Sequence, residues 1–395
     1  MLWLVDWPYL LKYNDVNKSC KCGIIQKGGT NMNDRNNVRK HYLDNVRWIT
    51  VVLVVIYHVF YMYNGQGIQG VLGKITDLDV QYWDVYQYAV YPWFMFLLFV
   101  VSGISSKLYL DSHSDKEFIK SRTNKLLVPS TIGLLVFQFI QGYFNTTLST
   151  DAKAMLSSLP LIGAYLILSV SGIGVLWYIQ VLWVFSILLV PVKKIEKNRL
   201  MDLGKKTGII AVLLMSVLVY GGAQILNTPI ICVYRFGYYG VAFFLGYFVF
   251  SHDEVIEVLK KWFILLLVLA MILGFVFCFE YFGENYADAP VNRYPLFTAY
   301  GWFASMAFLG GTAKYLDFTN TFATFMSRHS FGLYIFHYLG ISVIAVYIGS
   351  RHVLPAALVY LFSLISGFVT SYVLYELIIR IPFFRWAVLG IKKER

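Results

Sequence analysis

Hydrophobic residues lie along this chain in long runs, and charged residues gather in short clusters between them. A helix rises about 1.5 Å per residue, so a run of about 20 residues spans the roughly 30 Å hydrocarbon core of a membrane. The runs that we assign as spans cover residues 43–63, 84–106, 128–147, 174–192, 207–226, 236–250, 262–282, 296–313, 330–349 and 355–379. This pattern predicts an all-α fold, a polytopic integral membrane bundle of about ten transmembrane helices.

One stretch does not fit this spacing. Residues 154–192 carry no charge and are long enough for two spans. A second crossing would move the lysine-rich segment 193–206 to the outer side, against the preference of Lys and Arg for the cytoplasmic side. We therefore expect residues 154–173 to form an interfacial or re-entrant segment on the outer side.

Composition and charge agree with a membrane protein. Of the 395 residues, 58% are hydrophobic and 14% are charged, whereas about 25% of a soluble domain is charged. The net charge is +11, yet the outer loops would hold only Lys74, Lys153, Arg235, Arg293 and Arg351. By the positive-inside rule, both termini are expected in the cytoplasm, so the basic charge orients the protein and does not indicate a nucleic-acid partner.

Residues 1–31 differ from the rest because they are polar and show no helical period. Cys20 and Cys22 form a lone C-x-C without further ligands nearby, so no metal is expected there. The stretch KGGTNM can be encoded by a bacterial ribosome-binding sequence ahead of Met32. We expect residues 1–31 to be a mis-annotated or disordered extension, and residues 32–395 to form a single membrane domain.

Two polar residues share one face of the first span. Arg47 and His58 are eleven residues apart, which brings them to within about 20° on a helix, with His58 about 16 Å deeper. Asp44 lies one turn before Arg47 on the same side. An imidazole near the membrane centre must face other helices or a wet cavity. His58 is therefore a candidate general base, with interhelical hydrogen bonding as the alternative.

The ninth span repeats this arrangement. Arg328 stands at its cytoplasmic edge, and His337 follows nine residues later, in one polar stripe with Ser330 and Tyr334. We expect His337 to reach a depth similar to that of His58. In the last span, Glu376 lies near the cytoplasmic end, where it could pair with Arg47, Arg122 or Arg380 as a site residue or as a structural ion pair.

Two further motifs each allow two interpretations. Arg122 and Lys125 precede the third span, one turn apart on an expected short helix, and could bind phosphates or serve as ordinary positive-inside anchors. On the outer side, an aromatic-rich segment could stack on sugars or form an interfacial belt. It contains Tyr82, Trp83, Tyr86, Tyr88, Tyr91 and Trp93. Ser102 and Gly103, in FVVSG, indicate close helix packing.

These motifs resemble the acyltransferase-3 family of integral membrane acyltransferases, from about residue 40 onward. The resemblance lies in YLDNVRWITVVLVVIYH, FVVSG, RTNKLLVP and SFGLYIFH, in this order. The ending VLYELIIRIPFFRWAVLGIKK is most similar to the glucans biosynthesis branch, which contains the periplasmic glucan succinyltransferase. The chain departs from the family at Lys125, where Arg is usual, and at Val175, where His is common.

The resemblance implies an enzyme of the bacterial cytoplasmic membrane that moves an acyl group, acetyl or succinyl, from cytoplasmic acyl-CoA to a hydroxyl of an extracytoplasmic glycan. Carried over by position, His58 would be the essential histidine and Arg47 its partner, with Arg122 and Lys125 as the donor-side basic pair. The expected partners are the lipid bilayer, acyl-CoA and the glycan, with no metal. A secondary transporter using His58 and His337 as a proton relay is the alternative from another class.

Overall fold

The computed structural model describes residues 39–66, 71–229 and 233–392. Residues 1–31, with Cys20, Cys22 and the proposed start at Met32, lie outside this part of the chain, and so does Cys232. The remaining cysteine, Cys278, is a free thiol.

Within the described residues, seven helical segments are long and apolar enough to cross a membrane. They are α2 (His41–Met62), Tyr82–Leu110 with α3 (Val85–Val90) and α4 (Phe94–Leu110), Asp115–Thr147 with α5 (Asp115–Arg122), α6 (Val128–Gly133) and α7 (Phe139–Thr147), Gly174–Glu196 with α10 (Trp177–Glu196), α15 (Phe263–Tyr281), Thr321–Arg351 with α17 (Thr321–Tyr347), and α18 (Ala356–Ile378).

The other helices are shorter or less apolar. They are α8 (Thr150–Ser157), α9 (Leu161–Ser171), α11 (Arg199–Lys205), α12 (Ile209–Ala223), α13 (Phe236–Phe248), α14 (Asp253–Lys261), α16 (Pro295–Tyr315) and α19 (Pro382–Leu389). The strands β1 (Asn227–Pro229) and β2 (Val233–Arg235) pair antiparallel between α12 and α13. The all-α membrane bundle is confirmed, whereas the count of ten spans and the orientation of the termini stay predictions.

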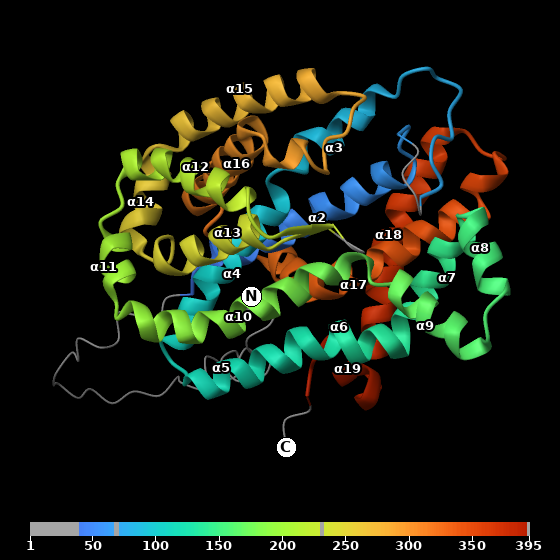
Figure 1. Ribbon diagram of the computed structural model, residues 1–395, viewed down its shortest axis with the longest axis horizontal. Coiled ribbons are helices and arrows are strands. Elements are labelled where there is room, and N and C mark those ends of the chain that lie inside the picture. Colours follow the sequence, from blue (N-terminus) through green and yellow to red (C-terminus); the bar gives the residue numbers. More distant parts are fainter. Residues whose placement is uncertain (1–38, 67–70, 230–232, 393–395) are drawn as a thin grey trace, which may run out of the picture.

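Helix α2 lies at the centre of the bundle, where it packs against α17, α4, α16 and α18 (Figure 1). Helix α4 in turn packs closely on α13, because Gly103 has no side chain. A Cβ at Gly103 would lie 2.0 Å from the carbonyl oxygen of Phe243. The close helix packing predicted from FVVSG is confirmed.

The uncharged stretch before α10 forms α8 and α9, which lie beside α7 (Figure 1). Helix α9 has 11 residues, or about 16 Å of rise, roughly half of a hydrocarbon core. It packs against α7 at Gly142, whose Cβ would lie 1.7 Å from the carbonyl oxygen of Leu168. This geometry suits the re-entrant segment expected for residues 154–173.

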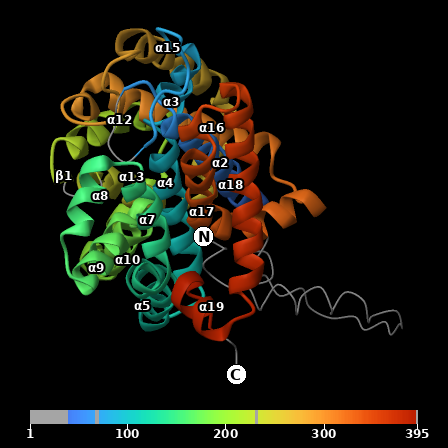
Figure 2. The ribbon, with the colours of Figure 1, turned by 90° about the vertical axis from the view of Figure 1, so that its right-hand side faces the viewer.

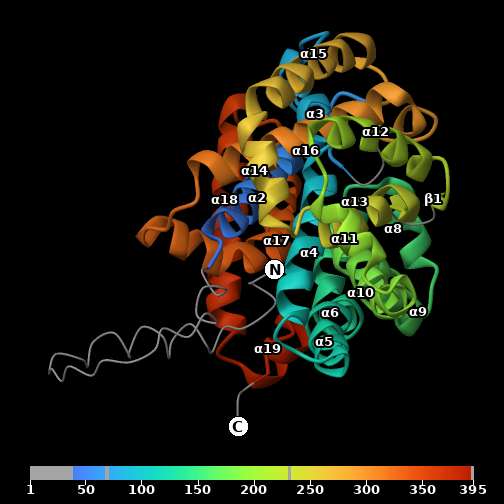
Figure 3. The ribbon, with the colours of Figure 1, turned by 90° about the vertical axis from the view of Figure 1, so that its left-hand side faces the viewer.

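Several connections predicted to lie on the cytoplasmic side contact one another. Figure 3 faces the end with α11 and α14, and Figure 2 faces the opposite end with α8. Ion pairs join the predicted cytoplasmic connections to one another, at Lys40–Asp253, Lys193–Asp115 and Lys205–Glu254. The alternating order of spans therefore agrees with the way that the loops pair in space.

Candidate active site

The two intramembrane histidines meet between α2 and α17. His337 Nε2 lies 3.0 Å from His58 Nδ1, and the two ring centroids are 4.9 Å apart. His337 is completely buried, whereas His58 is half-buried. The prediction that the two imidazoles reach a similar depth is confirmed. We call them the histidine pair.

Backbone carbonyls determine where the protons of the neutral histidine pair lie. His337 Nδ1 is 2.9 Å from the carbonyl oxygen of Leu333, so Nδ1 carries the proton and Nε2 accepts. His58 Nδ1 then faces two acceptors, His337 Nε2 and the carbonyl oxygen of Val54 at 2.9 Å, so it must carry a proton. The lone pair of His58 is therefore on Nε2, which has no hydrogen-bond partner among the described residues. This tautomer is the one that a general base needs.

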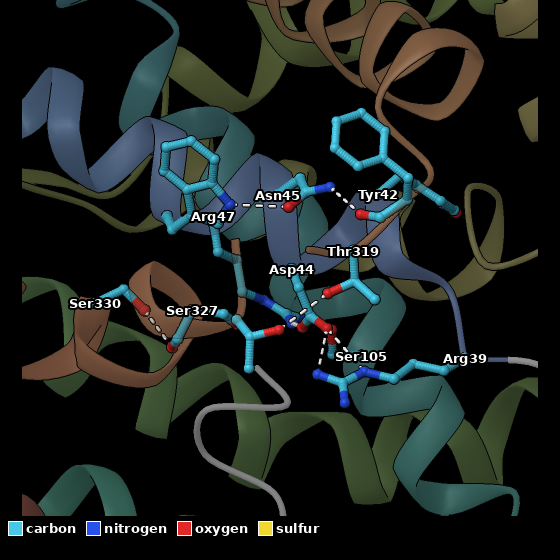
Figure 4. A network of polar contacts seen from close by, with 12 residues as sticks. Arg39, Tyr42, Asp44, Asn45, Arg47, Ser105, Thr319, Ser327 and Ser330 are labelled. Atoms are coloured by element: carbon cyan, nitrogen blue, oxygen red, sulfur yellow. Dashed lines mark hydrogen bonds and ion pairs between the residues drawn. The ribbon is translucent and has the colours of Figure 1, made fainter. Parts of the chain in front are cut away.

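A cluster of charged residues occupies the other end of the same stripe (Figure 4). Asp44 Oδ2 accepts hydrogen bonds from Arg39 at 2.7 and 3.0 Å, and its Oδ1 accepts from Arg47 Nη1 at 3.1 Å. Arg47 Nη2 also donates to Ser105 Oγ on α4. Asp44 and Arg47 are both buried. Their position on one helix face, predicted from the sequence, is confirmed, and the structure adds the ion pair between them.

Arg122 brings another positive charge to this cluster. Its side chain is 1% exposed and lies over the ring of Phe118 at 4.8 Å. Nη2 donates to Ser106 Oγ at 3.4 Å, while Nε and Nη1 have no hydrogen-bond partner among the described residues. Arg47 lies close enough to repel it.

We call Arg39, Asp44, Arg47 and Arg122 the arginine cluster. It contains three guanidinium groups and one carboxylate, Asp44, which pairs with Arg39 and Arg47 but not with Arg122. Burying an excess of positive charge is costly unless an anion compensates it. Planar guanidinium groups with unused N–H donors are suited to phosphate oxygens. The arrangement is therefore a candidate anion site.

Lys125 lies in a different local structure from the one that its spacing predicted. Residues Thr123–Leu127 form a π-helical turn after α5, so Arg122 and Lys125 do not sit on one regular short helix. Such turns are often found at functional sites. Arg122 is buried, whereas Lys125 is half-buried beneath the C-terminal end of α19, where a Cβ at Gly390 would touch its Cα.

Hydroxyl groups line the region between the arginine cluster and the histidine pair. Tyr178 OH lies 2.8 Å from Ser102 Oγ, and Tyr178 is within electrostatic range of both Arg47 and Arg122. Tyr334 OH donates to the carbonyl oxygen of Val175. The sequence analysis did not single out Tyr178, although it lies three residues after Val175, where the chain departs from the family.

Glu376 lies in a separate contact network. Its Oε1 is 3.2 Å from His329 Nε2, and its Oε2 is 3.8 Å from Arg380. The pairing with Arg380 was among those predicted, whereas no hydrogen bond or ion pair joins Glu376 to Arg47 or Arg122. His329, one residue after Arg328, was not predicted as its partner. A catalytic role for Glu376 stays a prediction.

Comparison with known proteins places this geometry in context. A family model described as an acyltransferase domain matches residues 40–376, which include both the histidine pair and the arginine cluster. No curated protein and no solved structure matches the chain.

Proposed function

The chain belongs to the acyltransferase-3 family, and from this premise we propose that it moves an acyl group from cytoplasmic acyl-CoA to a hydroxyl of an extracytoplasmic carbohydrate. As a member, it is a membrane acyltransferase that transfers groups other than amino-acyl groups. The observation that carries the proposal is the Nε2 atom of His58, which has no hydrogen-bond partner among the described residues. His337 orients the ring through Nδ1, and Arg47 lies on the same helix as His58.

The donor would bind along α2. The phosphates of CoA carry several negative charges, and the arginine cluster offers unpaired N–H donors for them. The thioester lies at the far end of a long, flexible arm, and His58 is about 16 Å from Arg47 along the helix axis. One donor molecule can therefore occupy both the arginine cluster and the space beside His58.

The proton has a complete route in this arrangement. His58 Nε2 takes the proton of the attacking hydroxyl. The hydroxyl oxygen bonds to the thioester carbonyl carbon, and the C–S bond breaks. The proton then passes to the departing thiolate, giving free CoA thiol. His58 Nδ1–H donates to His337 Nε2 throughout, which orients the ring and shares the positive charge. The attacking hydroxyl belongs to the acceptor, or to a residue that carries the acyl group briefly.

The acyl group is proposed to be acetyl or succinyl. The proposed location is the bacterial cytoplasmic membrane, with both termini inside. The family membership supports the enzyme over the proton-relay transporter, because thioester chemistry requires the base that His58 provides.

The first test is thiol release from acetyl-CoA and succinyl-CoA by the purified protein in detergent. We expect release by the wild type and a loss of about 100-fold or more in His58→Ala. The exposed loop residue His352 serves as the control, and His352→Asn should release thiol at the wild-type rate. Equal rates for His58→Ala and wild type would contradict the proposal.

A further inference from the structure

At the end of α2 opposite the arginine cluster, polar side chains of the aromatic-rich segment come together. We propose that Asp84 and Gln87 bind two neighbouring hydroxyl groups of the acceptor sugar, and this inference rests on the proposed function. Residues Tyr82–Asp84 form a 3₁₀ turn that continues into α3, which packs between α2 and α15 (Figure 1). Asp84 and Gln87 are three residues apart and therefore share one face of this helix.

The amide of Gln87 has a fixed orientation with its donor group unused. The backbone N–H of Gln66 donates to Asn64 Oδ1 at 2.7 Å, so Asn64 Nδ2 must point away and donate, which it does to Gln87 Oε1 at 3.1 Å. The amide nitrogen of Gln87 is consequently on the other side. It is buried and has no hydrogen-bond partner among the described residues.

Asp84 has the complementary property. Its Oδ2 accepts from Gln81 Nε2 at 3.1 Å and from the backbone N–H of Gly65 at 3.3 Å. Its Oδ1 has no partner in the described part of the chain, and no Lys, Arg or His there forms an ion pair with it. A buried carboxylate oxygen without a donor and a buried amide without an acceptor thus lie one turn apart. Buried polar atoms are normally paired, so these two indicate a polar ligand.

Asp84 lies just below the protein surface, whereas Gln87, one turn further along, is completely buried. Gly65 is exposed, and a Cβ on it would be 3.8 Å from Asp84 Oδ2, so only a residue without a side chain covers the carboxylate. Trp83 is 36% exposed and Tyr82 is 74% exposed beside it. A carboxylate, an amide and exposed aromatic rings are the groups that hold sugar hydroxyls and stack on a sugar ring, so the sugar-stacking interpretation is favoured over a simple belt.

A hydrogen-bond chain runs from this pair to Tyr57, whose ring contacts His58. Tyr286 OH donates to Gln87 Oε1 at 2.8 Å and lies 3.1 Å from Tyr57 OH. Burial raises the pKa of Tyr286 well above its ordinary value, so the phenol keeps its proton for Gln87. Tyr57 precedes His58, and their rings are 5.2 Å apart. Tyr286 and Tyr57 therefore connect a sugar held by Asp84 and Gln87 to the surroundings of the proposed base.

Two isosteric substitutions exchange donor and acceptor at the two unpaired atoms, Asp84 Oδ1 and Gln87 Nε2. Asp84→Asn keeps an oxygen for Gln81 and Gly65 but turns the free acceptor into a donor. Gln87→Glu keeps the oxygen that serves Asn64 and Tyr286 but removes the free donor. Gly65→Leu changes neither group and covers the carboxylate. Asp79→Asn, at an exposed carboxylate of the same connection, is the control.

Membranes with each variant are supplied with radiolabelled acetyl-CoA or succinyl-CoA and increasing amounts of the neutral polysaccharide fraction from the source organism's envelope. We expect the apparent KM for polysaccharide to rise about tenfold in Asp84→Asn, Gln87→Glu and Gly65→Leu. Thiol release without polysaccharide should persist in all three variants, and Asp79→Asn should match the wild type throughout, including its Tm.

An unchanged KM in the two isosteric variants would overturn the inference, because the unpaired atoms would then hold only water. A parallel loss of Tm and of polysaccharide-independent thiol release would assign the pair a structural role and overturn it as well. Thiol release by the wild type with no label on the polysaccharide would overturn this inference while the thioester chemistry stands. Absence of any thiol release would instead overturn the proposed function, and the inference with it.

Discussion

The proton position on His58 is set by two atoms, the carbonyl oxygen of Val54 one turn earlier and the imidazole nitrogen of His337 on another helix. Only the second of these can be altered by a side-chain substitution. His337 therefore offers a way to change the orientation of the base without touching the base itself. Two substitutions of His337 can separate its hydrogen bond from its packing. One side chain should offer an acceptor where His337 Nε2 lies, and the other should offer none.

We predict that His337→Ala lowers kcat for thiol release by about 100-fold, since an unoriented base loses much of its effect. His337→Gln should retain a larger share of the activity, because its amide oxygen can accept from His58 Nδ1. The measurement is the kcat and KM for the acyl-CoA donor of both variants. Equal activity of the two would show that the acceptor at this position does not matter.

Arg122 carries a second prediction at this scale. Removing a buried, incompletely paired charge relieves its desolvation penalty, so Arg122→Met should raise the Tm of the free protein. The same change should increase the donor KM about tenfold or more, with a smaller effect on kcat. Lys120→Gln, at an exposed site on the same helix, is the control. A variant that loses both stability and kcat would instead make Arg122 a structural residue.

The helical period was enough to select Arg47, His58 and His337 as candidate site residues, because each belongs to a polar stripe on an otherwise apolar helix. It could not identify Ser105, Ser106 or Tyr178. Serine and tyrosine are common in membrane spans, so their presence carries little information. Their role depends on the packing of α4 against α2 and of α10 against α4, which no local pattern reveals.

Among the helices, close contacts depend on glycine at particular points. Gly103 on α4 faces α13, and Gly246 on α13 faces α4, where a Cβ would lie 2.1 Å from the carbonyl oxygen of Val100. These contacts fix the position of α4. They thereby place Ser102 and Ser105, the second of which accepts a hydrogen bond from Arg47. The sequence predicted such packing from small residues, but the partner helix could be identified only from the structure.

We predict that Gly103→Ala destabilises the protein by about 1–3 kcal/mol, because backbone must shift to admit the methyl group. Gly221→Ala is the matched control, since no atom lies within 4 Å of its Cβ and alanine favours a helix by about 1 kcal/mol. Thermal unfolding in detergent should show a lower Tm for the first variant only. A similar Tm in both would contradict the close packing of α4 on α13.

For the whole molecule, the order of hydrophobic runs predicted the helical segments well, since membrane length and hydropathy constrain each segment locally. It did not predict that α2 and α17, with more than half of the sequence between them, would be neighbours. It also assigned a full-length span to residues 207–226, where α12 has only 15 residues, whereas the short run at 236–250 already pointed to the 13-residue α13. Such features depend on contacts between distant segments.

The orientation in the membrane can be tested directly. On a cysteine-free background, Asp79→Cys should react with an impermeant maleimide added outside intact cells, and Arg199→Cys should react only after the membrane is opened. Both positions are exposed. The prediction follows from the excess of Lys and Arg on the side of Arg199. The reverse pattern of labelling would place the arginine cluster outside, away from cytoplasmic acyl-CoA.

The distance between the arginine cluster and the Asp84–Gln87 pair has an energetic consequence. In the proposed orientation, the thiol is released on one side of the membrane and the ester is formed on the other. The reaction is then vectorial, and its reversal requires two products from separate compartments to meet at His58. A high ratio of acyl-CoA to free CoA in the cytoplasm would then drive ester formation on the outer side. A compartment without nucleotides or thioesters could thus be modified using cytoplasmic metabolism alone.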